Sequence, residues 1–202
     1  MYDNPKSTEE VNKTITSLAS NNIQAFLAKD KEDAKNKVLE LIPKEASVMT
    51  MTSVTLDELG IAKEINDSGS FNSVRTKLAT MDAKTEANEM KAMGATPEYT
   101  VGSVQAVTMD GKVIVASATG SQLPAYVYGA NHVIWVVGTQ KIVENLDESM
   151  ERIYDYVLPL ESERARKAYG VPGSLVAKLL VINKETTPGR ITIVFVPENI
   201  GY

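Results

Sequence analysis

The amino-acid sequence predicts an α/β fold with three layers, in which a mainly parallel, mixed sheet carries helices on both faces. Early in the chain, segments with helical periodicity alternate with short β-branched runs, which favours parallel strands joined by helices. The run His132–Val137 is almost entirely apolar, as is typical of a strand covered on both faces. Hairpin signals in the middle of the chain and at Thr186–Arg190 add antiparallel strands.

Two helices are predicted near the N-terminus. Ser7 and Glu10 have the spacing of a capping box, and apolar residues follow at helical intervals to about Asn22. Asp30 is a suitable N-cap for a second helix, which Pro43 ends. We expect these helices, within residues 1–43, to pack on a single domain that spans residues 1–202.

The next elements are a strand at Ser47–Met51 and a helix that begins near Leu56. Phe71–Arg75 is compatible with a short strand or a loop. A polar helix is predicted over Asp82–Met93, with Gly94 in the position that ends it.

A hairpin is predicted around Asp110–Gly111. This dipeptide favours a two-residue type I′ turn, in which both residues have positive φ. It joins Val104–Thr108 to Lys112–Ala116, and the second strand leads into the small residues Ser117–Ser121. A short helix is expected over Gln122–Tyr128.

The last third of the chain predicts one helix and two strands. Leu146–Tyr156 has helical spacing of apolar residues. Lys178–Ile182 and Ile191–Val196 are strands, and Pro188–Gly189 suits a turn that would make them antiparallel neighbours.

Composition excludes several classes of function. The chain has no cysteine, so disulfides, thiol catalysis and thiolate-bound metals are excluded, and with His132 as its one histidine we expect no metal site. The net charge of −5 argues against a nucleic-acid surface. Met1–Lys6 does not resemble a signal peptide, and no apolar run approaches the ~20 residues of a membrane span. We therefore expect a soluble cytoplasmic protein.

Ligands of parallel α/β sheets bind where the strands end at their carboxyl side. The loops Thr52–Thr55 and Ser117–Gln122 leave such ends. Thr119, Gly120 and Ser121 could hold a phosphate or carboxylate through N–H and hydroxyl groups. The same triplet is also what a plain turn into a helix looks like.

Further candidates for ligand binding are Ser53 and Thr55, although either could instead cap the following helix. Arg164 and Arg166 could supply bidentate recognition of an anion, with Arg190 as a weaker candidate. The charged run around the first two arginines is also typical of a solvated helix face.

The order of these segments resembles the LUD domain, the lactate-utilisation family. The resemblance is carried by the hairpin, the triplet Thr119–Ser121, the following helix and the strand His132–Gly138. It extends upstream to Thr50–Gly60, and downstream through Leu158–Arg166 to Pro188–Ile191. It implies a fold similar to that of ribose-5-phosphate isomerase, glucosamine-6-phosphate deaminase and CoA transferases.

One position departs from the family pattern. Many members carry an acidic residue before the triplet, where this chain has Ala118. A carboxylate there could act as acid, base or nucleophile, and alanine cannot. Glu161 or Glu163 could replace it. The catalytic residues and the cofactor therefore stay unknown, and the sequence leaves open whether the chain is an enzyme.

The resemblance implies a protein that binds a small anionic metabolite or a nucleotide, with a role in lactate utilisation beside oxidoreductase subunits. The alternative is a non-catalytic assembly or regulatory subunit of a lactate-oxidising complex. A sugar-phosphate isomerase or a CoA transferase is a third reading. The resemblance, together with the aromatic segment Tyr126–Tyr128, also predicts a homodimer.

Overall fold

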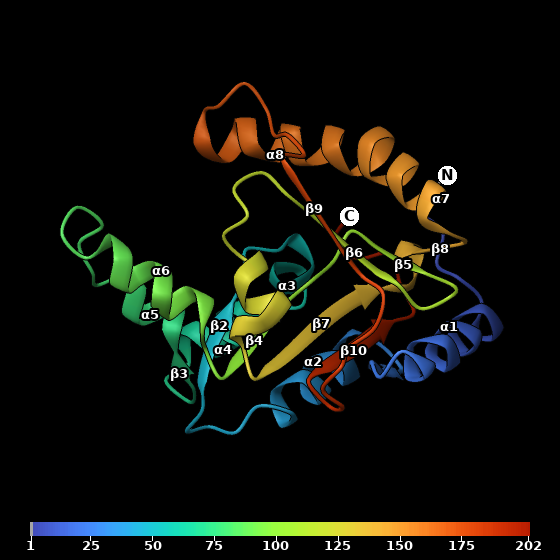
Figure 1. The fold of residues 1–202 in the computed structure, drawn as a ribbon, viewed down its shortest axis with the longest axis horizontal. Coiled ribbons are helices and arrows are strands. Elements are labelled where there is room, and N and C mark those ends of the chain that lie inside the picture. Colours follow the sequence, from blue (N-terminus) through green and yellow to red (C-terminus); the bar gives the residue numbers. More distant parts are fainter. Residues whose placement is uncertain (1) are drawn as a thin grey trace.

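The computed structural model describes residues 2–202, so Met1 of the N-terminal prediction lies outside the described residues. A six-stranded sheet forms its centre (Figure 1). In spatial order the strands are β1 (Gln24–Leu27), β10 (Ile191–Val196), β7 (His132–Gly138), β4 (Tyr99–Gly102), β2 (Ser47–Thr50) and β3 (Asn72–Ser73). Each neighbouring pair is parallel. The predicted α/β class with a mainly parallel sheet is confirmed.

Both faces of this sheet are covered. One face packs on α2 (Lys31–Glu40), α3 (Val54–Glu58) and α4 (Ile61–Asp67), through one hydrophobic cluster. The other face packs on α1 (Thr8–Ser20), α5 (Val74–Leu78), the π-helix η1 (Ala125–Gly129) and a second sheet, through another cluster. Within β7, Ile134 belongs to the first cluster and Trp135 to the second, because successive side chains of a strand point to opposite faces.

The second sheet holds the antiparallel pairs. Its order is β8 (Ile142–Val143), β5 (Ala106–Thr108), β6 (Val113–Ser117) and β9 (Lys178–Ile182). β6 is antiparallel to both β5 and β9. The expectation that β9 and β10 are antiparallel neighbours is wrong, since they lie in different sheets. β10 is buried between β1 and β7, whereas β9 lies at an exposed edge.

A row of helical segments lies outside the second sheet. After the 3-10 turn η2 (Thr139–Lys141), the chain forms α7 (Leu146–Glu151), η3 (Arg152–Val157) and α8 (Leu158–Tyr169). They follow one another as one long rod at the top of Figure 1. Ile153 anchors the rod on Ala106 and Ile114 of the small sheet.

The N-terminal region contains a strand that the sequence pattern did not predict. The capping box of Ser7 and Glu10 is present, but α1 ends at Ser20, and Asn22 adopts the left-handed conformation with φ 57°. The chain then forms β1, whose one sheet partner is β10. Local sequence carries little signal for such a strand, because Gln24 pairs with Thr192 from the other end of the chain.

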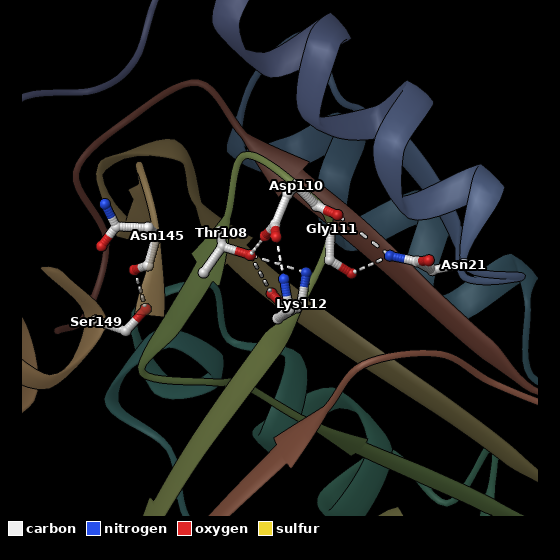
Figure 2. A network of polar contacts seen from close by, with 7 residues as sticks. All are labelled: Asn21, Thr108, Asp110, Gly111, Lys112, Asn145 and Ser149. Atoms are coloured by element: carbon white, nitrogen blue, oxygen red, sulfur yellow. Dashed lines mark hydrogen bonds and ion pairs between the residues drawn. The ribbon is translucent and has the colours of Figure 1, made fainter. Parts of the chain in front are cut away.

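The hairpin at Asp110–Gly111 forms with a different turn. Gly111 has φ 84°, but Asp110 is not among the described residues with positive φ, so the turn is not type I′. The Gly111 N–H donates to the Thr108 carbonyl and the Thr108 N–H to the Lys112 carbonyl, which gives a three-residue loop with glycine in the left-handed position. The Asp110 carboxylate contacts the Thr108 hydroxyl and Lys112 (Figure 2), and these local bonds stabilise the wider loop.

This turn also docks helix α1. The Asn21 side-chain amide donates to the carbonyls of Asp110 and Gly111, at 3.2 and 3.0 Å (Figure 2). A Cβ added at Gly111 would lie 2.7 Å from the backbone carbon of Ser17. Glycine is therefore required here both for its φ and for the close approach of the helix.

The polar helix before β4 begins later than predicted and continues through Gly94. It is α6 (Ala87–Ala95), and Gly94 lies inside its last turn. Thr96 is the C-cap, and its N–H still bonds to the Ala92 carbonyl. The next residue is Pro97, which has no N–H to continue the helix.

Candidate functional site

Three side chains meet at the carboxyl ends of neighbouring strands. Thr55 follows β2 as part of α3, Ser103 follows β4, and Lys141 ends η2 after β7. The Lys141 Nζ donates to the Thr55 Oγ1 at 2.9 Å and to the Ser103 Oγ at 3.1 Å. The strands β2, β4 and β7 are adjacent and parallel, which brings these residues to the edge where ligands of such sheets bind.

Lys141 is held in an unusual state for a lysine. Its side chain is 1% exposed, and it forms no ion pair within residues 2–202. Burial, with a smaller contribution from the charge of Arg152, lowers the pKa of Lys141 to about 7, while Glu58 acts in the opposite direction. The amine therefore exchanges between its charged and neutral forms near neutral pH.

Arg152, the first residue of η3, is a second buried cation. Its Nη1 donates to the Gln105 carbonyl, while Nε and Nη2 have no hydrogen-bond partner among the described residues. The rings of Tyr2 and Tyr156 lie near the guanidinium, with centroids at 5.9 and 5.3 Å. Burial lowers the pKa of Arg152 to about 10, which leaves it charged at neutral pH. The rings attract the positive charge of the guanidinium, but they do not accept hydrogen bonds from the N–H groups in its plane.

The charge of Arg152 contributes to the lowered pKa of Lys141, so the two buried cations interact, and we call them the Lys141–Arg152 centre. Neither has a carboxylate partner in the described part of the chain, although the protein as a whole carries a net charge of −5. A buried charge without a partner costs several kcal/mol. An anion at this place would remove that cost and use the free guanidinium donors, so the centre has the chemistry of an anion site.

The segment Ile200–Tyr202 lies against this centre. The Gln140 Nε2 donates to the carbonyls of Ile200 and Gly201, at 2.9 and 3.2 Å, and the Gly201 N–H donates to Glu58 at 3.2 Å. A Cβ added at Gly201 would lie 2.2 Å from the Thr55 Oγ1. Glycine is thus needed for this segment to pack against the hydroxyl that holds Lys141.

Tyr202 links the segment to one of the predicted arginines. Its hydroxyl donates to Glu161 at 2.7 Å, and Glu161 accepts two bonds from Arg164, each at 2.7 Å. Burial alone would raise the pKa of Glu161, but the bonds from Arg164 and Tyr202 lower it. The carboxylate that Arg164 binds is therefore supplied by its own helix. Arg166 donates to the Pro172 carbonyl at 3.2 Å and is exposed.

The two candidate residues of the loop Thr52–Thr55 have different roles. Ser53 is the N-cap of α3 and accepts a bond from the Leu56 N–H at 3.4 Å, which is the capping alternative raised by the sequence. Thr55, the other candidate of this loop, belongs to the Lys141–Arg152 centre.

The triplet Thr119–Ser121 follows β6 in the second sheet. The Gly120 N–H donates to the Ser117 hydroxyl at 2.8 Å, and the Ser121 N–H to the Thr119 hydroxyl at 3.3 Å. Gly120 has φ 83°, and a Cβ there would lie 2.6 Å from the Lys178 side chain. No hydrogen bond among residues 2–202 joins this loop to the centre. Polar contacts therefore place Thr55 with Lys141, Arg164 with Glu161 and the triplet by itself, whereas Ser53 caps α3 and Arg166 bonds to Pro172.

The sequence reasoning missed Lys141, Ser103 and Arg152. The rule that ligands bind at carboxyl ends of strands applies equally to the residues after β4 and β7, and it points to the first two. Arg152 carries no such signal, because one arginine among charged residues of a helix resembles a surface residue.

Two further properties concern the described residues as a whole. Within residues 2–202, no three histidine or carboxylate side chains are grouped so that they could hold a metal ion. In the same range, no helix combines the length and the apolar composition of a membrane span.

Arg190, the weaker candidate, is buried in an ion pair with Glu185 at 2.8 Å and also donates to backbone carbonyls.

Comparisons with known proteins agree with the sequence pattern and the fold. The family model of the LUD domain matches residues 11–196. Among solved structures, a DUF162 family protein from Deinococcus radiodurans is similar, with a TM-score of 0.59 and 11% sequence identity over 95% of this chain and 99% of that one. This likeness shows a shared fold. No curated protein matches the sequence significantly. The match over most of its length shows that the chain belongs to the LUD domain family.

Proposed function

We propose that this LUD-domain protein binds a small anionic metabolite at the Lys141–Arg152 centre, in a process linked to lactate utilisation. The observation that carries the proposal is a pair of buried cations without carboxylate partners in the described chain, of which Lys141 lies at the carboxyl edge of a parallel sheet. The link to lactate comes from the family, and the two buried cations are the reason to propose a negatively charged ligand.

The donors of the centre suit a carboxylate or a phosphate. The Nε and Nη2 of Arg152 form one edge of the guanidinium, which can bind two oxygens at once. Lys141 adds a point charge, and the hydroxyls of Thr55 and Ser103 can donate to or accept from a ligand. Lactate, pyruvate, sugar phosphates, nucleotides and CoA all carry such anions.

Calorimetric titration with lactate, pyruvate, ribose 5-phosphate, AMP and CoA tests this proposal. Loss of one charge-assisted contact costs about 1.5–3 kcal/mol, so Lys141→Met should weaken binding of the active ligand about tenfold or more. Lys91→Ala serves as a control, because Lys91 is exposed on α6 and belongs to neither proposed position. Absence of binding by every anion would refute the proposal.

The same titration decides between this centre and the triplet Thr119–Ser121. The triplet remains our second proposed position for the anion, with the side chain of Lys178 beside it and with Ser53, Arg164 or Arg166 as predicted contributors. Gly120→Val should leave affinity unchanged if the ligand lies at Lys141. If Gly120→Val abolishes binding while Lys141→Met does not, the ligand lies at the triplet.

A non-catalytic assembly or regulatory subunit is the second candidate function. It is favoured by the exposed Ala118, which lacks the carboxylate common at this position, and by the exposure of Val127 and Tyr128, at 53% and 89%. We propose a cytoplasmic homodimer that contacts oxidoreductase subunits. Sedimentation at micromolar concentration tests self-association, because a monomer has a mass of 22.0 kDa.

A sugar-phosphate isomerase or CoA transferase is the third candidate. Both would use an anionic substrate, but neither has an assigned carboxylate here. Assays of ribose 5-phosphate isomerisation and of CoA transfer between carboxylates test these activities directly.

A further inference from the structure

We propose that the Lys141 amine captures a carbonyl compound, an aldehyde or ketone that also carries a carboxylate or phosphate, as a reversible imine. The inference rests on the proposed function, because Arg152 would hold the anionic group of the same molecule. It adds a covalent step and narrows the ligand to compounds with a carbonyl carbon.

The surroundings of Lys141 distinguish it from lysines that act as charges. Lys167 and Lys31 are paired with carboxylates, at 2.6 and 3.2 Å, and lie exposed at the surface. The Lys141 Nζ instead contacts two neutral hydroxyls and is almost fully buried. A lysine placed in this way is favourable for nucleophilic chemistry, which requires the neutral amine.

Burial makes this neutral form accessible. With a pKa of about 7, about half of the Lys141 amines are neutral at pH 7, against fewer than about one in a thousand for a lysine of pKa 10.5. The hydroxyls of Thr55 and Ser103 lie within hydrogen-bond distance and can hold the lone pair or pass a proton.

The step is balanced without an oxidant or a reductant. The Nζ lone pair attacks the carbonyl carbon, a C–N bond forms, and the carbonyl oxygen takes up a proton that the nitrogen loses. The resulting hydroxyl then accepts a second proton, which also comes from the nitrogen, and leaves as water, while the nitrogen forms a double bond to carbon. Thr55 and Ser103 are placed to relay these protons.

The carbonyl compound reaches Nζ only when one wall of the centre moves, since Lys141 is 1% exposed. The segment Ile200–Tyr202 is such a wall, because Gly201 lies on the Thr55 hydroxyl. Gln140 and Glu58 bond to the backbone of this segment, Tyr202 bonds to Glu161, and the side chain of Ile200 is buried in the core. Opening at Gly201 therefore requires the bonds to Gln140 and Glu58 to break, while Ile200 can keep its place in the core.

Reductive trapping tests the inference. The protein is incubated at pH 7.5 with pyruvate, glyoxylate or ribose 5-phosphate and sodium cyanoborohydride, and adducts are measured by intact mass and located by peptide mapping. We expect one compound to give a single adduct on Lys141, formed at least about tenfold faster than on any other lysine. Lys141→Met should lose this adduct, while Lys91→Arg, on the exposed side of α6, should retain it. Lactate, which has no carbonyl carbon beside its carboxylate, is the negative control.

Mapping of the wild-type protein keeps the test valid if Lys141→Met does not fold. Absence of an adduct with all three compounds, or adducts spread over exposed lysines, would overturn the inference. Calorimetry on the same samples then reports on the proposed function separately. If anions bind but no adduct forms on Lys141, the proposed function stands and the imine is wrong. If no anion binds, the proposed function fails as well.

Discussion

Replacement of Lys141 by methionine should change how stability depends on pH. The pKa of Lys141 is about 7 in the folded protein, against 10.5 for a free lysine, so the two values are about 3.5 pH units apart. Between them the unfolded chain binds a proton that the folded chain does not, so the unfolding free energy rises with pH. Below pH 7 both states are protonated and this slope vanishes. Each pH unit corresponds to about 1.36 kcal/mol, which gives an upper limit of about 5 kcal/mol for the whole interval.

Urea unfolding at pH 7.5, 8.5 and 9.5 measures this effect, with fluorescence of the one tryptophan, the buried Trp135, as the signal. The difference in unfolding free energy, wild type minus Lys141→Met, should rise by about 1.4 kcal/mol per pH unit. Lys91→Met, at an exposed position, is the matched control for the loss of one lysine. If the unfolding free energies of wild type and Lys141→Met changed with pH in the same way, Lys141 would have the pKa of an ordinary lysine. That result would refute the low pKa on which the amine chemistry depends.

Three further predictions concern other positions. Gly111→Ala should lower the unfolding free energy by more than Gly189→Ala, which should cost about 1–2 kcal/mol. Both glycines have positive φ, but only Gly111 lies against α1. Equal losses in urea unfolding would contradict this reasoning. Glu185→Gln should cost about 3 kcal/mol or more, because it leaves Arg190 buried without its charged partner, and an unchanged melting temperature would exclude this. Binding of an anion should raise the pKa of Lys141, so up to one proton should be taken up at pH 8. Calorimetry in two buffers of different ionisation enthalpy measures this uptake, and its absence would place the ligand away from Lys141.

The bounds of several strands could be predicted from the sequence, whereas their pairing could not. Lys178–Ile182 and Ile191–Val196 are observed as predicted, because β-branched runs between turn residues define a strand locally. Their assignment to different sheets depends on distant partners, such as β1 for the second strand. The turn at Asp110 was predicted in position but not in type, since the Thr108 and Lys112 side chains contact its carboxylate.

The candidate site, too, could be predicted from the sequence only where local pattern was sufficient. Thr55 was identified because it follows a predicted strand and begins a helix. Lys141 was overlooked because its burial results from the surrounding fold, including the segment Ile200–Tyr202 from a distant part of the sequence. The state of Arg152 depends in the same way on Tyr2 and Tyr156. Charge and burial together mark such residues, and a sequence shows only the first.

The place of β10 in the sheet has a consequence for the order in which the protein is made. β10 lies between β1 and β7, and β1 has no other partner in the sheet. During synthesis, residues 24–27 therefore leave the ribosome long before residues 191–196, with which they pair. Until then β1 and the side of β7 that binds β10 expose unpaired backbone groups, and such edges promote association with other chains. Pairing across so long a sequence separation also favours slow folding. Chaperones that shield nascent chains would thus matter most for residues 24–27 and 132–138, until residues 191–196 are available to pair with both.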